Sequence, residues 1–338
     1  MLSTHTVNLI PYEGVSPQFA STPIAALPGH AVVGRVTLGH RAWLGAGSVI
    51  RADGHYVTAG DDFQLGRGAT VHISHERYPT VMGHRVRVGA GAVVHACHLG
   101  NDVLVEEGAV ILDGASIGDG AVIAAGSIVY PRSELEGGML YAGRPAKPVR
   151  RLTPLEYESR ANELYERNLK AKTEWLCRPI AATCADSAFI AKTAGLLGDV
   201  RLEASSSVWF GCQLDAQHAP ISIGERCNVQ DNSILIAQSM GITLGADTTI
   251  GHNVTLEDCS VGARCLVGMG SLISTGTEIP DNTFVAAGCV TAEGQKLSGG
   301  YVWGGNPAKI IGNIDDKKIE IILITSGVYA EYAQKLKD

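Results

Sequence analysis

Aliphatic residues that recur at every sixth position constrain the fold of this chain more than any other feature of its sequence. In the first half the two unbroken series are Val32, Leu38, Leu44 and Ile50, and then Leu99, Val105, Ile111, Ile117, Ile123 and Val129. This period matches neither the roughly 2 residues of a strand nor the roughly 3.6 of a helix. It fits a short strand followed by a tight corner, of which three make one triangular turn with the aliphatic side chains stacked inward. The hexapeptide pattern therefore predicts an all-β fold, a left-handed parallel β-helix.

The second half of the chain repeats this pattern, so the sequence predicts a tandem duplication. Its series are Leu196, Leu202, Val208 and Leu214, then Leu244, Ile250 and Leu256, and then Val261, Val267, Ile273, Ile279 and Val285. "GRPAK" at 143–147 also matches "GNPAK" at 305–309. A core of stacked aliphatic residues explains why 6% aromatic content is enough for 338 residues.

A stretch rich in helix formers follows each repeat region, and the first of them, at 152–175, contains no glycine. Thr153 is a candidate N-cap with Pro154 behind it, and the tail from Lys317 onward resembles a second helix. We therefore predict a first β-helix at 1–150, a helical linker at 151–177, a second β-helix at 178–312 and a C-terminal helix at 313–338. Each helix is expected to lie along its own coil or along a neighbouring one.

Charge and composition exclude several classes of function. A net charge of -7 leaves no basic stripe for phosphates, so we predict no nucleic-acid partner. The eight cysteines form no C-x-x-C pair, which favours a reducing compartment over a zinc knuckle or a disulfide framework. No apolar run reaches the roughly 20 residues of a membrane span, and the first residues show no clear targeting pattern.

Several segments resemble the gamma class of carbonic anhydrases, including its mitochondrial members. They are "SVWFG" at 207–211, "NVQDNS" at 228–233, "IGHNVTLEDC" at 250–259 and "VWGGNPAK" at 302–309, with "RAD" at 51–53, "ATVHIS" at 69–74, "YPTVMG" at 78–83 and "VVHAC" at 93–97 in the first half. The resemblance covers nearly the whole chain in two copies. It implies a trimer of coils with a metal at each subunit interface, zinc or alternatively iron or cobalt.

In that family two histidines from one coil and a third from its neighbour hold the metal, which activates water toward carbon dioxide. The first half keeps His72 and His95 but has Ala90 at the third position. In the second half Ile236 and Glu257 replace the pair, while His252 keeps the third. The losses are complementary, so the predicted metal site is His72, His95 and His252, with the first half facing the second.

The supporting residues divide in the same way. Arg51 and Asp53 of the family's R-G-D segment survive in the first half, whereas Asp215 and Gln217 stand at those positions in the second. Gln230 and Asp231 of the family's Q-D segment survive in the second half, whereas Gly66 and Arg67 stand at those positions in the first. The resemblance implies that Gln230 lies beside the reacting water and that Arg51 pairs with Asp53 and, across the interface, with Asp231.

A ring of three cannot alternate two kinds of coil, so the fused pair needs a third gamma carbonic anhydrase-like coil, either from another protein or from a second copy of this chain. Because only the interface of the first half with the second would have all three histidines, we expect one metal site per assembly. The resemblance implies carbon dioxide and bicarbonate as reactants, and membership of mitochondrial respiratory complex I beside its membrane-arm subunits. The expected location is the matrix side of the inner membrane, or otherwise the cytoplasm. Two alternatives stay open: an inactive structural scaffold, and a hexapeptide acyltransferase that uses coenzyme A.

Overall fold

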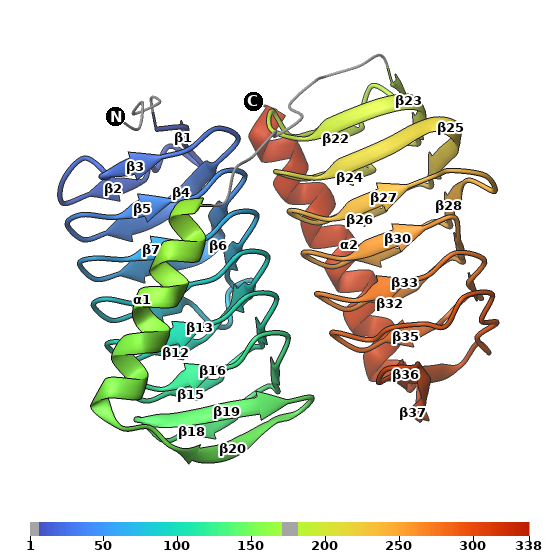
Figure 1. The fold of residues 1–338 in the computed structure, drawn as a ribbon. Coiled ribbons are helices and arrows are strands. Elements are labelled where there is room, and N and C mark those ends of the chain that lie inside the picture. Colours follow the sequence, from blue (N-terminus) through green and yellow to red (C-terminus); the bar gives the residue numbers. More distant parts are fainter. Residues whose placement is uncertain (1–6, 171–181, 338) are drawn as a thin grey trace. The chain divides into compact units, whose positions relative to one another are not determined.

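The polypeptide forms two units, Met1–Trp175 and Leu176–Asp338, and each is described by itself. A computed structural model describes residues 7–170 and 182–337. In both units short parallel strands are stacked into a solenoid, with one long helix after the last rung (Figure 1). The predicted all-β architecture of two tandem parallel β-helices, each followed by a helix, is confirmed.

The first solenoid has three strand-lined sides, two of which are joined by the long strand β6 (Val49–Ala59). The start of β6 pairs with β8 and its end with β9, so these sides form one twelve-stranded sheet. Its other members are β1 (Leu9–Ile10), β2 (Gln18–Phe19), β4 (Ala31–Leu38), β8 (Thr70–His72), β9 (Thr80–Met82), β11 (Val93–His95), β12 (His98–Leu99), β14 (Val110–Ile111), β15 (Ser116–Ile117), β17 (Ile128–Val129) and β18 (Glu134–Leu135). The third side comprises β3 (Ala25–Ala26), β5 (Trp43–Leu44), β7 (Gln64–Leu65), β10 (Arg87–Val88), β13 (Leu104–Val105), β16 (Val122–Ile123), β19 (Met139–Gly143) and β20 (Ala146–Arg151).

The second solenoid repeats this plan, with β25 (Gln213–Ile223) in the place of β6. The joined sides also contain β21 (Thr183–Cys184), β23 (Gly195–Leu202), β27 (Ile234–Ile236), β28 (Ile242–Leu244), β30 (Thr255–Glu257), β31 (Ser260–Val261), β33 (Leu272–Ile273) and β34 (Glu278–Ile279). The other side comprises β22 (Phe189–Ile190), β24 (Ser207–Val208), β26 (Asn228–Val229), β29 (Thr249–Ile250), β32 (Leu266–Val267), β35 (Phe284–Val285), β36 (Tyr301–Gly304) and β37 (Lys309–Asn313).

The core of each solenoid is the predicted stack of aliphatic residues. Every member of the six-residue series lies buried in the hydrophobic cluster of its own unit. Successive rungs put like residues side by side, as where Val94 pairs with Ile111 and Leu256 with Ile273. Parallel strands buried in this way need a continuous apolar register, which the period of six supplies.

Both units bend the chain at the same place with a glycine. Gly34 and Gly198 have φ values of +74° and +80°, where the register of β4 against β6 and of β23 against β25 shifts. A Cβ atom would lie 2.4 Å from the carbonyl oxygen of Ala52 at Gly34, and 2.1 Å from that of Ala216 at Gly198. Only glycine fits both the backbone conformation and the space.

Each helix packs along the solenoid that precedes it (Figure 1). Helix α1 (Pro154–Lys170) buries Ala161 and Leu164 against the first unit. Helix α2 (Asp316–Lys337) contacts β22, β24, β26 and β29 of the second. The predicted linker extends to 177, and its part beyond Lys170 lies outside the described residues, so the predicted domain boundaries stay a prediction.

Helix α1 begins where the sequence predicts. Thr153 precedes its first residue, Pro154, and the Thr153 hydroxyl and the Glu156 carboxylate bond each other's backbone N–H groups. This reciprocal pair is a capping box. The Thr153 N–H and Arg150 hold the pKa of the Glu156 carboxyl at about 2.

Within the described parts of the chain, neither helix is long and apolar enough to cross a membrane. The seven described cysteines carry free thiols, and Cys177 lies outside the described residues. Burial raises the pKa of the Cys227 and Cys259 thiols to about 12. These buried cysteines behave as small apolar core residues.

Candidate metal centre

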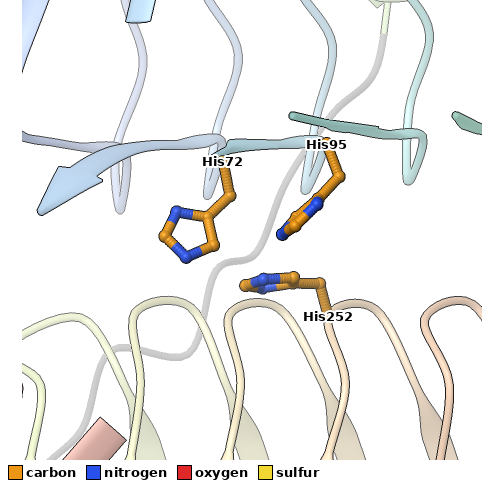
Figure 2. Close-up of side chains that lie close together, drawn as sticks. All are labelled: His72, His95 and His252. Atoms are coloured by element: carbon orange, nitrogen blue, oxygen red, sulfur yellow. The ribbon is translucent and has the colours of Figure 1, made fainter. Parts of the chain in front are cut away.

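His72 and His95 lie side by side on the first solenoid because strands β8 and β11 end at the same level. The two residues are register partners. Their rings meet edge to face with centroids 5.3 Å apart, and both side chains are buried. Figure 2 shows the two imidazoles projecting to the same side from neighbouring strands. The stacking of rungs thus presents two imidazoles side by side on one coil.

The contact at Nδ1 of each histidine decides whether the other ring nitrogen, Nε2, carries a proton or a lone pair. His72 Nδ1 lies 2.8 Å from the backbone oxygen of Arg51, and His95 Nδ1 lies 2.7 Å from Asp113 Oδ1. Both partners accept hydrogen bonds, so Nδ1 carries the proton and the lone pair is on Nε2. Metal-binding histidines are oriented by such a second contact.

The charge of Asp113 favours this arrangement. Burial by itself raises the pKa of the Asp113 carboxyl, but His95 and the Ser74 hydroxyl more than offset it, so that the pKa lies below its ordinary value. An ionised Asp113 accepts a strong hydrogen bond from the imidazole.

Arg51 and Asp53 form a fully buried ion pair beside His72. The second carboxylate oxygen of Asp53 lies 3.9 Å from His72 Nδ1. The pair therefore exists as predicted, within the first unit. A buried ion pair adds little net stability, because desolvation offsets most of the attraction.

The second solenoid places Gln230, Asp231 and His252 on adjacent rungs, and all three are buried. Asp231 Oδ2 lies 3.2 Å from His252 Nδ1, while Asp231 Oδ1 accepts a hydrogen bond from the Phe210 N–H. Gln230 donates from Nε2 to Asn228 Oδ1 at 3.1 Å. His252 thus has a carboxylate beside one ring nitrogen.

The structure also places the residues that replace the ligands. Asp215, Ile236 and Glu257 are register partners on successive strands of the second unit, in the column that Arg51, His72 and His95 occupy in the first. We call this column the paired face of a unit. The single face carries Asp231 and His252 in the second unit and Arg67 and Ala90 in the first.

Two contacts of the site were not predicted from the sequence. Asp113, which accepts from His95, lies one rung after it, so a search at rung spacing would have found it. Tyr329 of α2 lies with its hydroxyl 3.4 Å from His252 Nε2 and packs edge to face on Trp209. Tyr329 could not be found from the six-residue period, because it lies on a helix outside the repeats. His75 and His98, near the candidate ligands in sequence, are exposed.

Two models of hexapeptide-repeat families match parts of the chain. The model for bacterial transferase hexapeptide repeats matches residues 96–131, and that for the hexapeptide repeat of succinyl-transferase matches 220–257 and 259–291. A solved hexapeptide transferase family protein from Anaplasma phagocytophilum is 29% identical, with a TM-score of 0.44, over 45% of this chain and 91% of that one.

Curated relatives are similar to about half of the chain. Gamma carbonic anhydrase 1, mitochondrial, of Arabidopsis thaliana is 32% identical over 44% of this chain, which spans 56% of that protein's length. Protein YrdA of Escherichia coli is 39% identical over 50% of this chain and 94% of its own length. Together with the duplicated hexapeptide solenoid, these matches show that the chain belongs to the gamma-class carbonic anhydrase family.

Proposed function

We propose that the protein holds one metal ion with His72, His95 and His252 and hydrates carbon dioxide reversibly there. Figure 2 labels these three histidines, the candidate metal ligands of the described residues. The observation that carries the proposal is the way in which the candidate ligands and their supporting residues are distributed between the two units. Each keeps the supporting residues only for the ligands that it keeps, Asp113 with His95 and Asp231 with His252.

The donor set fits a metal. Three imidazoles suit zinc and also iron or cobalt, and two of them have the lone pair on Nε2 fixed by contacts at Nδ1. When bound, a zinc ion held in this way supplies a Lewis acid that lowers the pKa of water to about 7.

The other predicted residues support the reaction by position. Gln230, held by Asn228, is proposed to orient the attacking water through its amide. The buried Arg51–Asp53 pair fixes the strand from which His72 is oriented. We propose that Arg51 also pairs with Asp231 of the second unit. After this pair, strand β6 has His55 and Tyr56, with rings 4.9 Å apart, rather than a glutamate, so we expect proton release to depend on buffer.

Metal content of the full chain tests the proposal. We expect about one zinc or iron per chain by elemental mass spectrometry, lost in His252→Ala and His72→Ala because three ligands are needed. His218→Ala, at an exposed histidine of the second unit, should keep the metal. A folded chain without metal, or one that keeps it in His252→Ala, would falsify the site. A carbon dioxide hydration assay on the loaded protein then tests the reaction.

We further propose that the fused pair completes a trimer with a third solenoid, at the matrix side of the mitochondrial inner membrane with membrane-arm subunits of complex I. The names of the Arabidopsis relatives, which are mitochondrial, support the compartment. The alternative of an inactive scaffold is supported by the loss of ligands in each unit. It predicts correct assembly without metal. Turnover of acetyl-coenzyme A would instead favour the acyltransferase alternative.

A further inference from the structure

The two units carry opposite charges at two equivalent positions. On the paired face Arg51 of the first unit corresponds to Asp215 of the second. On the single face Arg67 of the first corresponds to Asp231 of the second. At both positions the first unit has a positive charge where the second has a negative one. The sign of the charge is thus reversed between the units on the paired face and on the single face.

These four charged residues differ in how far they are buried. Arg51 and Asp231 are buried, whereas Arg67 is exposed and Asp215 is half-buried. Asp215 accepts hydrogen bonds from the backbone and the side chain of Gln217, both at 3.1 Å. Among the described residues, neither Arg67 nor Asp215 has an ion-pair partner. Each unit thus has one buried charge on one face and one unmatched charge on the other.

The second unit's paired face is acidic beyond Asp215. Ile236 follows on the next strand and the half-buried Glu257 on the one after, so the face has two carboxylates around an apolar residue. A surface of this kind accepts a partner that is apolar at the centre and cationic at its edge.

We propose that the third solenoid of the ring is a separate subunit with reversed charges, an Arg or Lys on its single face opposite Asp215 and an Asp or Glu on its paired face opposite Arg67. This inference rests on the proposed function, in which the first unit's paired face meets the second unit's single face. The remaining faces, with Asp215 and with Arg67, are then those that receive the partner.

Copies of this chain do not satisfy these faces. If the first unit of another copy completes the ring, Arg51 meets Arg67. If the second unit of another copy completes it, Asp215 meets Asp231. Either ring contains one like-charge contact in a desolvated interface, and such contacts select against wrong partners. A ring of three closes without repulsion only with a subunit of the opposite pattern.

The mass of the full chain in solution tests the inference. The native chain, purified alone, should sediment as a single chain of 35.5 kDa. In Arg67→Asp with Asp215→Arg every paired face carries Arg and every single face Asp, so copies can close rings. We expect the mass to rise about threefold, to three chains whose six units form two rings. The exposed pair Lys296 and Glu278 provides a matched control, because Lys296→Glu with Glu278→Lys leaves both faces and the net charge unchanged.

Two results would overturn the inference: a native chain that already assembles from copies, or a folded double variant that remains a single chain. Each single substitution also permits one kind of ring, Arg67→Asp of first units and Asp215→Arg of second units, so misfolding of one variant leaves the other as a test. Metal content of the native chain separates the proposals. A chain that binds metal but forms rings from copies would contradict only the proposed partner with reversed charges. A chain without metal would contradict the proposed metal site.

Discussion

The paired faces of the two solenoids have the same backbone and different chemistry. In the first unit the column reads Arg51, His72 and His95, with Asp113 behind His95. In the second it reads Asp215, Ile236 and Glu257, in the same register on equivalent strands. The fold of a rung is therefore insensitive to what its corner presents, because the stability comes from the inward aliphatic stack.

This difference teaches that the two copies differ in opposite directions: the first has its histidines on the paired face and the second has its histidine on the single face. A single coil that forms rings from copies needs every ligand and every charge in one chain. Once two coils are joined in one chain, the two units can meet different neighbours. A face that does not contribute to a metal site then no longer has to keep its ligands and charges. The residues that remained equal should matter for folding, and those that diverged should matter for the site or its partners.

The largest expected effect concerns what the units share. Gly34→Ala and Gly198→Ala should each destabilise the protein by roughly 3 kcal/mol or more, since a left-handed backbone costs a non-glycine residue about 1–3 kcal/mol and the new Cβ atom also meets a carbonyl oxygen. Differential scanning calorimetry measures the loss. Gly14→Ala is the control, with a φ of +74° and no atom within 4 Å of the added carbon. If Gly198→Ala unfolds no more easily than Gly14→Ala, the bend is not a common requirement of both units.

The next effect concerns what the units do not share. Asp113→Asn should weaken metal binding about 10–100-fold, because His95 loses the carboxylate that orients its ring and raises its basicity. Competition with a chelator measures the affinity. The equivalent residue of the second unit is Thr275, where the histidine is also absent, and Thr275→Ala should leave the affinity unchanged. Equal affinities for Asp113→Asn and the native chain would mean that the Asp113 carboxylate does not support metal binding.

The period of six was enough to predict the two cores, since each inward residue depends only on its own rung and its neighbours. The start of α1 was also predictable, because Thr153, Pro154 and Glu156 act within one turn of chain. The ion pair of Arg51 with Asp53 came from the family resemblance. Local and periodic signals thus gave most of the fold.

Contacts between elements of different period were not predictable. Tyr329 reaches His252 from α2, and Asn168 of α1 donates to the backbone oxygen of Val88 in the first unit. Both depend on how a helix is rotated against the solenoid, which packing over its whole length decides. Asp113 was missed for a simpler reason, since it follows the rung spacing but belongs to no quoted motif.

A third prediction uses a loop in which the units differ. The second unit has a shorter connection between β27 and β28, and Asp258 accepts hydrogen bonds there from the N–H groups of Ser239, Met240 and Gly241. The first unit has Ala96 at that position and a longer loop. Asp258→Asn should cost about 1–3 kcal/mol at neutral pH, because charge-assisted hydrogen bonds are lost.

The pH dependence of this cost has a definite sign. Burial raises the pKa of the Asp258 carboxyl, but the N–H donors outweigh it and the folded pKa lies below the ordinary value of 3.8. The contribution is therefore complete above pH 3.8 and is lost as the pH falls through the folded pKa. Denaturant unfolding between neutral and acid pH should show the two proteins converging below about pH 4. Asp186→Asn, at an exposed residue of the same unit, should give no such convergence. A constant difference across this range would remove the carboxylate from the explanation.

The smallest expected effect sharpens the comparison of the two helices. Thr153→Ala should destabilise α1 by about 1 kcal/mol, because the Thr153 side chain no longer accepts from the Glu156 N–H at the helix start. Thermal unfolding of the full chain measures the change, with Asn162→Ala on the exposed side of α1 as the control. Helix α2 starts differently, with Asp315 accepting from the Lys318 N–H and pairing with its side chain. Thr153→Ala could instead bring the pKa of the Glu156 carboxyl back up toward its ordinary value without changing the stability of the protein. In that case α1 is held by its packing on the solenoid alone, and the cap that the sequence predicts serves only to mark where the helix begins.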